Sequence, residues 1–86
     1  MTKARRRKAG QRMVEVEWAD AATQHGWGDP AEHAARPVPM CRTLGYLIRS
    51  DRSGVYVSGT ICTNDNGVAD TTRIPRGMVL RVRRVR

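Results

Sequence analysis

The alternation of apolar and polar residues in several short segments most constrains the fold of this chain. In MVEVEW, Val14, Val16 and Trp18 fall on one side and two glutamates on the other. A two-residue period puts successive side chains on opposite faces of a strand, so residues 13–18 predict a half-buried strand. Further short segments of strand-like composition predict four more strands, at residues 41–50, 54–62, 67–74 and 79–84.

The same alternation predicts which side chains share a face of each later strand. In the second strand, one apolar face would consist of Leu44, Tyr46 and Ile48, with Leu47 on the other side. In the third strand, the apolar side would consist of Val55, Val57, Gly59 and Ile61. In the last strand, Leu80 and Val82 would point inward, whereas Arg81 and Arg83 would point outward.

The segments between the predicted strands carry turn signals. DRSG (51–54) and NDNG (64–67) are turns by composition, and PRGM (75–78) predicts one tight helical turn because proline lacks an amide hydrogen. Residues 19–39 show no strand pattern and are long for a connection in a small domain. Within them, Asp29 followed by Pro30 and Glu32 is typical of a helix start, and Pro37 would end that helix.

A chain of 86 residues forms one small domain. Its pattern predicts an all-β fold over residues 13–86: a small, five-stranded antiparallel, partly open SH3-like barrel whose long first loop carries a short helix. Curling of the sheet would reduce its exposed edges. The alternative is an open five-stranded sheet with the loop helix packed on it. Residues 1–12 lack apolar periodicity and predict a basic, disordered tail.

The net charge of +8 is concentrated at the two ends of the chain. Residues 1–12 hold six bases and residues 76–86 hold five, with no acid in either segment, whereas residues 13–75 hold five bases and eight acids. Attraction to a polyanion is therefore expected at the ends. The candidate nucleic-acid-binding residues are Lys3, Arg5, Arg6, Arg7, Lys8, Arg81, Arg83, Arg84 and Arg86.

Two structural alternatives to nucleic-acid binding stay open for these bases. The N-terminal run would equally serve as a solubilising tail. Arg81 and Arg83 would lie about 7 Å apart on one face of a strand, where they would also protect a sheet edge from aggregation. Because we expect both to point outward, we expect their replacement by glutamine to leave the fold intact.

The two tryptophans have different expected roles. Trp18 is in phase with Val14 and Val16, which indicates burial in the core. Trp27 stands between two glycines without any such phase. It is either an anchor for the loop or an exposed ring on which a base stacks.

The sequence gives little support for metal binding, catalysis or membrane insertion. The spacing of His25, His33, Cys41 and Cys62 matches no zinc pattern, so we expect neither metal nor cofactor. The aspartates suit turns and caps, and no motif of a nucleophile with its base is present, so we expect no enzyme. No apolar run approaches the roughly 18 residues that cross a bilayer.

Four short motifs resemble a group of small proteins encoded by bacteriophages and prophages. They are VEVEWADA (14–21), a second tryptophan after a short gap, GYL (45–47) and IPRGMV (74–79). The resemblance implies a phage accessory protein in the cytoplasm of the infected bacterial host, and the arginine-rich ends are not part of the shared pattern.

Together with the charged ends, this resemblance makes binding of a polyanion, foremost nucleic acid, the leading functional expectation. One alternative is a host-takeover or anti-defence protein that binds a bacterial protein or sequesters a nucleotide signal. The other is a structural component of the virion. The small size and the exposed strand edges also lead us to expect a homodimer.

Overall fold

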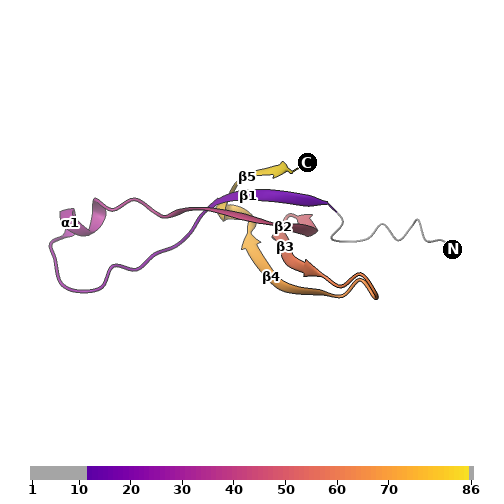
Figure 1. Ribbon diagram of the computed structural model, residues 1–86. Helices are drawn as coiled ribbons and strands as arrows, with labels where there is room; N and C mark the ends of the chain where they lie inside the picture. The colour runs from indigo at the N-terminus through magenta and orange to yellow at the C-terminus, as the bar shows by residue number, and fades with distance from the viewer. Residues whose placement is uncertain (1–11, 86) are drawn as a thin grey trace.

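The computed structural model describes residues 12–85, which form a single antiparallel sheet of five strands (Figure 1). The strands are β1 (Met13–Ala19), β2 (Met40–Asp51), β3 (Gly54–Ile61), β4 (Val68–Pro75) and β5 (Val79–Arg84). A short helix, α1 (Pro30–Ala34), lies between β1 and β2, and the 3-10 turn η2 (Arg76–Met78) precedes β5. The all-β prediction is confirmed, and every predicted strand agrees with the structure to within one residue at each end.

The strand order is β4-β3-β2-β1-β5, so the first four strands are sequential neighbours and β5 returns beside β1. Within the described residues, β4 and β5 form the two edges of a sheet that does not close. In the part of the chain between residues 12 and 85, no helix is long and apolar enough to cross a membrane.

The core lies on one face of this sheet. Its buried side chains come from three strands: Val14, Val16, Val55, Val57 and Ile74. Trp18, Leu47, Met78 and Val79 are partly buried and pack against them. The alternation predicted for β1 and for the first half of β3 is therefore the alternation that builds the core.

The predicted apolar face of β2 is not the core face. Leu44 is 57% exposed, whereas Leu47 packs against the core. The reason is the pairing of β1 with β2, which sets Leu44 opposite Glu15 and Gly45 opposite Val14. A Cβ atom at Gly45 would lie 2.8 Å from the Ser58 carbonyl oxygen, so glycine permits the close approach of β2 and β3 there.

The predicted inward position of Leu80 is also wrong. Trp18 pairs with Val79 and Glu17 pairs with Arg81, which leaves Leu80 as the extra residue of a β-bulge. Its side chain is 55% exposed, and Met78 and Val79 pack against the core in its place. The turn at residues 76–78, predicted from PRGM, is confirmed as η2 and positions Met78.

Residues 20–39, which we call the arm, project away from the sheet (Figure 1). The Asp20 amide donates to the Pro39 carbonyl across the base of the arm (3.0 Å). At the far end, Asp29 and Glu32 form the reciprocal hydrogen bonds of a capping box at the start of α1, as predicted. The helix has no buried residue, so the alternative is wrong in packing it on the sheet, although the sheet is open as that alternative expected.

Candidate nucleic-acid interface

The arginines of β5 face carboxylates of β1. The register sets Arg83 opposite Glu15 and Arg81 opposite Glu17, on the face opposite the core. Arg83 Nη2 donates to Glu15 Oε1 at 2.5 Å, and Arg81 Nε lies 3.8 Å from Glu17 Oε1. The two arginines do share one face, as predicted, but the charge of that face is partly neutralised by the two glutamates.

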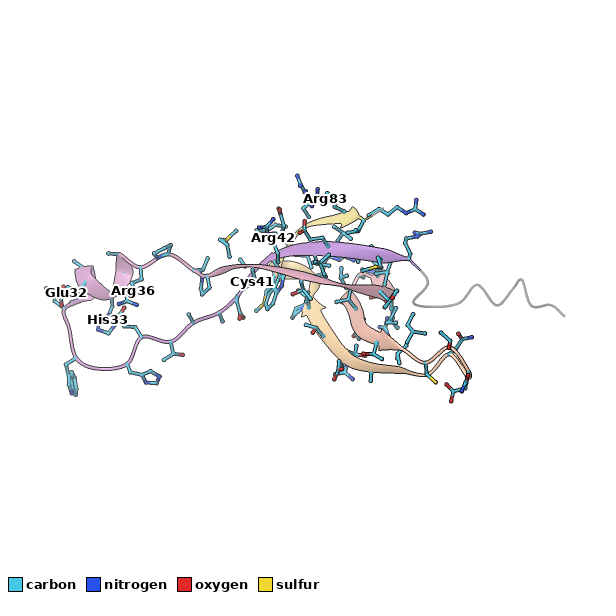
Figure 2. The ribbon with its side chains drawn as sticks, in the orientation of Figure 1. Glu32, His33, Arg36, Cys41, Arg42 and Arg83 are labelled. Carbon is cyan, nitrogen blue, oxygen red and sulfur yellow. The ribbon has the colours of Figure 1, made fainter. Side chains whose placement is uncertain are left out.

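Arg42 on β2 adds a third cation to this face (Figure 2). Its Nη1 atom lies 3.7 Å from Glu15 Oε2, on the opposite side of that carboxylate from Arg83. The Glu15 side chain is only 10% exposed, whereas those of Arg42 and Arg83 are 67% and 53% exposed. The Glu15 carboxylate therefore contacts both guanidinium groups, and much of each arginine side chain stays exposed to solvent. We call Arg42, Arg81 and Arg83 the arginine cluster.

The beginning of β1 and the end of β5 lie side by side. The Val85 amide donates to the Met13 carbonyl (2.9 Å), and the Leu47 amide donates to the Arg12 carbonyl (2.8 Å). Arg84 pairs opposite Val14, so its side chain leaves the sheet on the other face from Arg83. We call this part of the sheet, with Arg12, Arg83 and Arg84, the cationic end.

The predicted site residues of the two chain ends are only partly described. Arg81, Arg83 and Arg84 lie on β5 as stated above. The others fall outside residues 12–85: Lys3, Arg5, Arg6, Arg7, Lys8 and Arg86. The basic segment that contains the first five of these is joined to the sheet at Arg12, and Arg86 follows Val85 directly, so both segments are attached at the cationic end.

The two tryptophans lie in contrasting environments. Trp18 is partly buried against the core, and its Nε1 donates to Thr43 Oγ1 at 2.9 Å, which confirms its structural role. Trp27 is fully exposed in the arm, so it does not anchor the loop to the core. Figure 2 places the neighbouring part of the arm, marked by Glu32 and Arg36, far from Arg42 and Arg83. The structure thus keeps Trp27 apart from the arginine cluster.

A second group of arginines, which the sequence did not predict as a site, surrounds Tyr56. The register aligns Arg49 on β2, Tyr56 on β3 and Arg73 on β4 in one row across the sheet. The guanidinium carbon of Arg49 lies 4.6 Å from the centroid of the Tyr56 ring, a cation–π contact. Tyr56 alternates with Val55 and Val57 in the sequence, which indicates that its side chain lies on the face opposite the core. The arginines on both sides of it, however, are placed there only by the strand pairing.

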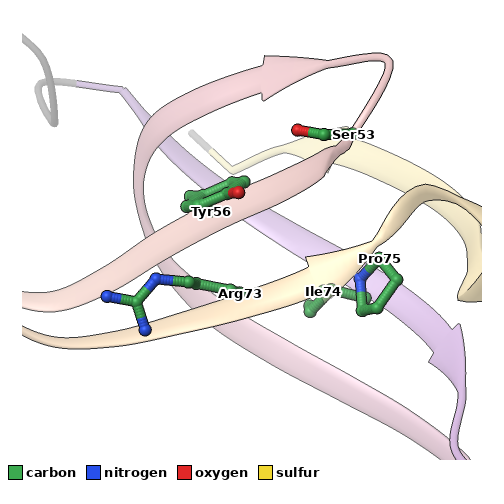
Figure 3. A pocket seen from close by; sticks show the side chains of 5 residues that line it. All are labelled: Ser53, Tyr56, Arg73, Ile74 and Pro75. Atoms are coloured by element: carbon green, nitrogen blue, oxygen red, sulfur yellow. The ribbon is translucent and has the colours of Figure 1, made fainter.

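Beside Tyr56 is a shallow pocket of about 110 Å³ (Figure 3). Its walls come from the β2–β3 turn and from β3 and β4, and its lining residues are Ser53, Tyr56, Arg73, Ile74 and Pro75.

The β2–β3 turn next to this pocket is fixed by Asp51. The carboxylate accepts hydrogen bonds from the Ser53 hydroxyl (2.6 Å), the Ser53 amide (2.9 Å) and Arg49 Nε (2.6 Å). The hydroxyl and guanidinium donors, in that order, hold the pKa of Asp51 well below its usual range. Arg76 donates to the Asp51 carbonyl and to Ser50 Oγ, and so ties η2 to the same turn.

Between residues 12 and 85, no group of three or more histidine, cysteine, aspartate or glutamate side chains is arranged to hold a metal ion. Cys41 and Cys62 are free thiols; Cys41 is partly exposed and Cys62 is exposed. Comparisons of the chain with protein-family models, with curated proteins and with solved structures found no match.

Proposed function

We propose that this protein binds nucleic acid through the cationic end of its sheet. The observation that carries the proposal is the antiparallel pairing of β1 with β5, in which Val85 donates to Met13. Because of this pairing, the segment of residues 1–12, which holds six bases, joins the sheet beside the last arginines of the chain, Arg83, Arg84 and Arg86. One phosphate backbone could therefore contact both.

The arginine cluster supports the same function. Lysine and arginine release condensed counterions when they contact phosphates, which gives affinity without reading of the base sequence. Three arginines face two glutamates on this side of the sheet, and the more buried carboxylate, Glu15, positions two of the guanidinium groups. A guanidinium that is already oriented loses less side-chain entropy when it binds a phosphate.

The resemblance to phage-encoded proteins supports a biological setting for this activity. We place the protein in the cytoplasm of an infected bacterium, as an accessory protein that acts on viral or host nucleic acid. A virion component that contacts packaged DNA would use the same surface.

Capture of a bacterial protein is a second candidate function, and the arm favours it. Within the arm, Trp27 is fully exposed and Val38 is more than half exposed. Exposed aromatic and aliphatic side chains gathered on one projecting segment are typical of protein-binding surfaces.

Fluorescence anisotropy with labelled duplex and single-stranded oligonucleotides tests the proposed function. The variant Arg81→Gln/Arg84→Gln removes one arginine from the arginine cluster and one from the cationic end. We expect it to weaken binding and to reduce the salt slope by about two, since two phosphate contacts are lost. Arg36→Gln is the matched control, because it removes an arginine from the arm (Figure 2). Equal weakening by both variants, or no binding by the intact chain, would reject the proposal and leave protein capture as the better candidate.

A further inference from the structure

The pocket beside Tyr56 is a site of its own, on the opposite edge of the sheet from β5. It lies where β3 pairs with the edge strand β4, two strands away from β1. Its volume of about 110 Å³ is several times what a single water molecule needs. The pocket is therefore large enough for part of an organic ligand.

One wall of the pocket presents an aromatic ring that is supported by a chain of contacts. Arg49 lies over the Tyr56 ring, and Arg49 is itself held by Asp51 through a 2.6 Å hydrogen bond. Asp51 in turn is held by Ser53, which also lines the pocket. A ring with this support needs little rearrangement to accept a flat group, and Pro75 adds a second apolar surface.

The opposite side of the pocket carries a cation with no partner among residues 12–85. Arg49 is paired with Asp51, and Arg76 donates to the Asp51 carbonyl and to Ser50. Arg73, in contrast, makes no side-chain hydrogen bond or ion pair within this part of the chain. No carboxylate lines the pocket, so the Arg73 guanidinium is available to an anion of the ligand.

We propose that this pocket binds a nucleotide, with the base against Tyr56 and Pro75 and the phosphate at Arg73. Aromatic rings accept bases by stacking, and guanidinium groups bind phosphate oxygens with two parallel hydrogen bonds. The nucleotide is either a free mononucleotide or one residue of a single strand. The inference goes beyond the proposed function, because it does not require the cationic end to bind anything.

Two-dimensional NMR titration of the full chain tests this site, with adenosine 5′-monophosphate, adenosine, inorganic phosphate and a short oligothymidylate as probes. If the ligand is a free nucleotide, we expect the mononucleotide to change the NMR chemical shifts of residues 53–56 and 73–75. If the ligand is a single strand, we expect the oligonucleotide alone to change them. Adenosine and phosphate should each bind more weakly than the mononucleotide, since each supplies only half of the contacts.

Two variants and one control separate a binding role from a general charge effect. We expect Arg73→Gln to weaken binding about tenfold, in line with the loss of a charged hydrogen bond. We expect Tyr56→Leu to weaken binding at least about fivefold, the low end for base stacking. Arg52→Gln, which removes an exposed arginine from the adjacent turn, should change nothing.

The inference would be overturned if no probe shifts these residues, or if Arg52→Gln weakens binding as much as Arg73→Gln. It would also be overturned if inorganic phosphate or an oligoglutamate peptide bound as well as the nucleotide, because the pocket would then bind anions in general. The variant Arg81→Gln/Arg84→Gln should retain binding of the mononucleotide. This variant thereby distinguishes a failure of the proposed nucleic-acid binding at the cationic end from a failure of the proposed nucleotide binding in the pocket.

Discussion

At the scale of single residues, the ion pair between Glu15 and Arg83 determines which arginine of β5 can be replaced without loss of stability. A nearly buried carboxylate is costly unless it is paired and hydrogen-bonded. Glu15 is nearly buried and receives a 2.5 Å hydrogen bond from Arg83, whereas the Glu17–Arg81 pair is looser and more exposed. We therefore revise the expectation that both arginines are replaceable without effect on the fold, and keep it for Arg81 only.

We expect Arg83→Gln to lower the free energy of unfolding by about 1–2 kcal/mol. A fully buried pair would lose 3–5 kcal/mol, but Arg83 is half exposed and the effect is screened by solvent. Arg81→Gln is the matched control and should change it by less than about 0.5 kcal/mol. Urea denaturation measures both values, and equal losses from the two variants would contradict this account of Glu15.

Asp51 gives a prediction about pH. Its pKa is lowered in the folded chain by the Ser53 hydroxyl and by Arg49, so its carboxylate stabilises the fold fully above the unfolded pKa of about 4. That contribution is lost progressively as the pH falls below this value. We expect Asp51→Asn to be less stable than the natural chain at pH 7, and the difference in melting temperature to shrink toward pH 2.

Asp65 does not confuse this comparison. The pKa of Asp65 is also lowered, mainly by a hydrogen bond from the Gly67 amide and less by one from Cys62. Asp65 is present in the natural chain and in Asp51→Asn, so its effect cancels in the difference between them. A difference in melting temperature that stays constant from pH 7 to pH 2 would show that the Asp51 charge contributes nothing.

At the scale of elements, the arm and the sheet are separate in structure. The side chains of residues 21–32 are exposed, α1 contributes nothing to the core, and the Asp20–Pro39 hydrogen bond closes the sheet side of the arm. We expect replacement of residues 21–39 by Asn-Gly-Thr, which favours a tight hairpin turn and restores an amide donor where Pro39 has none, to change the melting temperature by only a few degrees.

This replacement also tests the role assigned to the arm. Under the proposed function, the shortened chain should bind duplex oligonucleotides as the natural chain does. Loss of the strand signal in circular dichroism would mean that the arm is needed for the sheet to fold. Loss of duplex binding with the fold intact would mean that the arm, and not the cationic end, binds the nucleic acid.

The strands themselves were largely predictable, because a two-residue period and turn residues are local signals. The face taken by β2 and by the first residues of β5 was not, because it depends on strand pairing: β1 sets Leu44 on the face opposite the core, and a bulge leaves Leu80 exposed. Leu80 and the irregularity between Leu47 and Arg49 both depend on pairing with distant strands. For the same reason the sequence placed Arg81 and Arg83 on one face but did not predict that Glu15 and Glu17 lie opposite them.

The pocket illustrates the same limit. Arg49, Tyr56 and Arg73 are brought together only by the registers of two strand pairs. No local spacing of these residues distinguishes them from charged residues on an ordinary exposed face. Asp29, Pro30 and Glu32, in contrast, form a motif within four residues, and the predicted start of α1 was correct.

At the scale of the whole molecule, the sheet leaves two edges unpaired by other described strands, and such edges tend to pair with a second chain. We expect the protein to form a homodimer. Multi-angle light scattering should then give twice the chain mass of 9.6 kDa at high micromolar concentration. A mass of one chain at that concentration would contradict this prediction.

Phosphates are proposed to bind where the basic N-terminal segment joins the sheet beside the end of β5. The most direct test is a salt titration of duplex binding by the natural chain and by a chain that lacks residues 1–11 and keeps Arg12. If about six phosphates are neutralised, the logarithm of the affinity should fall against the logarithm of the salt concentration with a slope of roughly −5.

The shortened chain lacks five bases, and each lost phosphate contact makes the slope shallower by about one. We therefore expect a slope that is shallower by several units for the shortened chain, with unchanged circular dichroism. Binding that does not depend on salt, or the same slope and affinity for both chains, would contradict it.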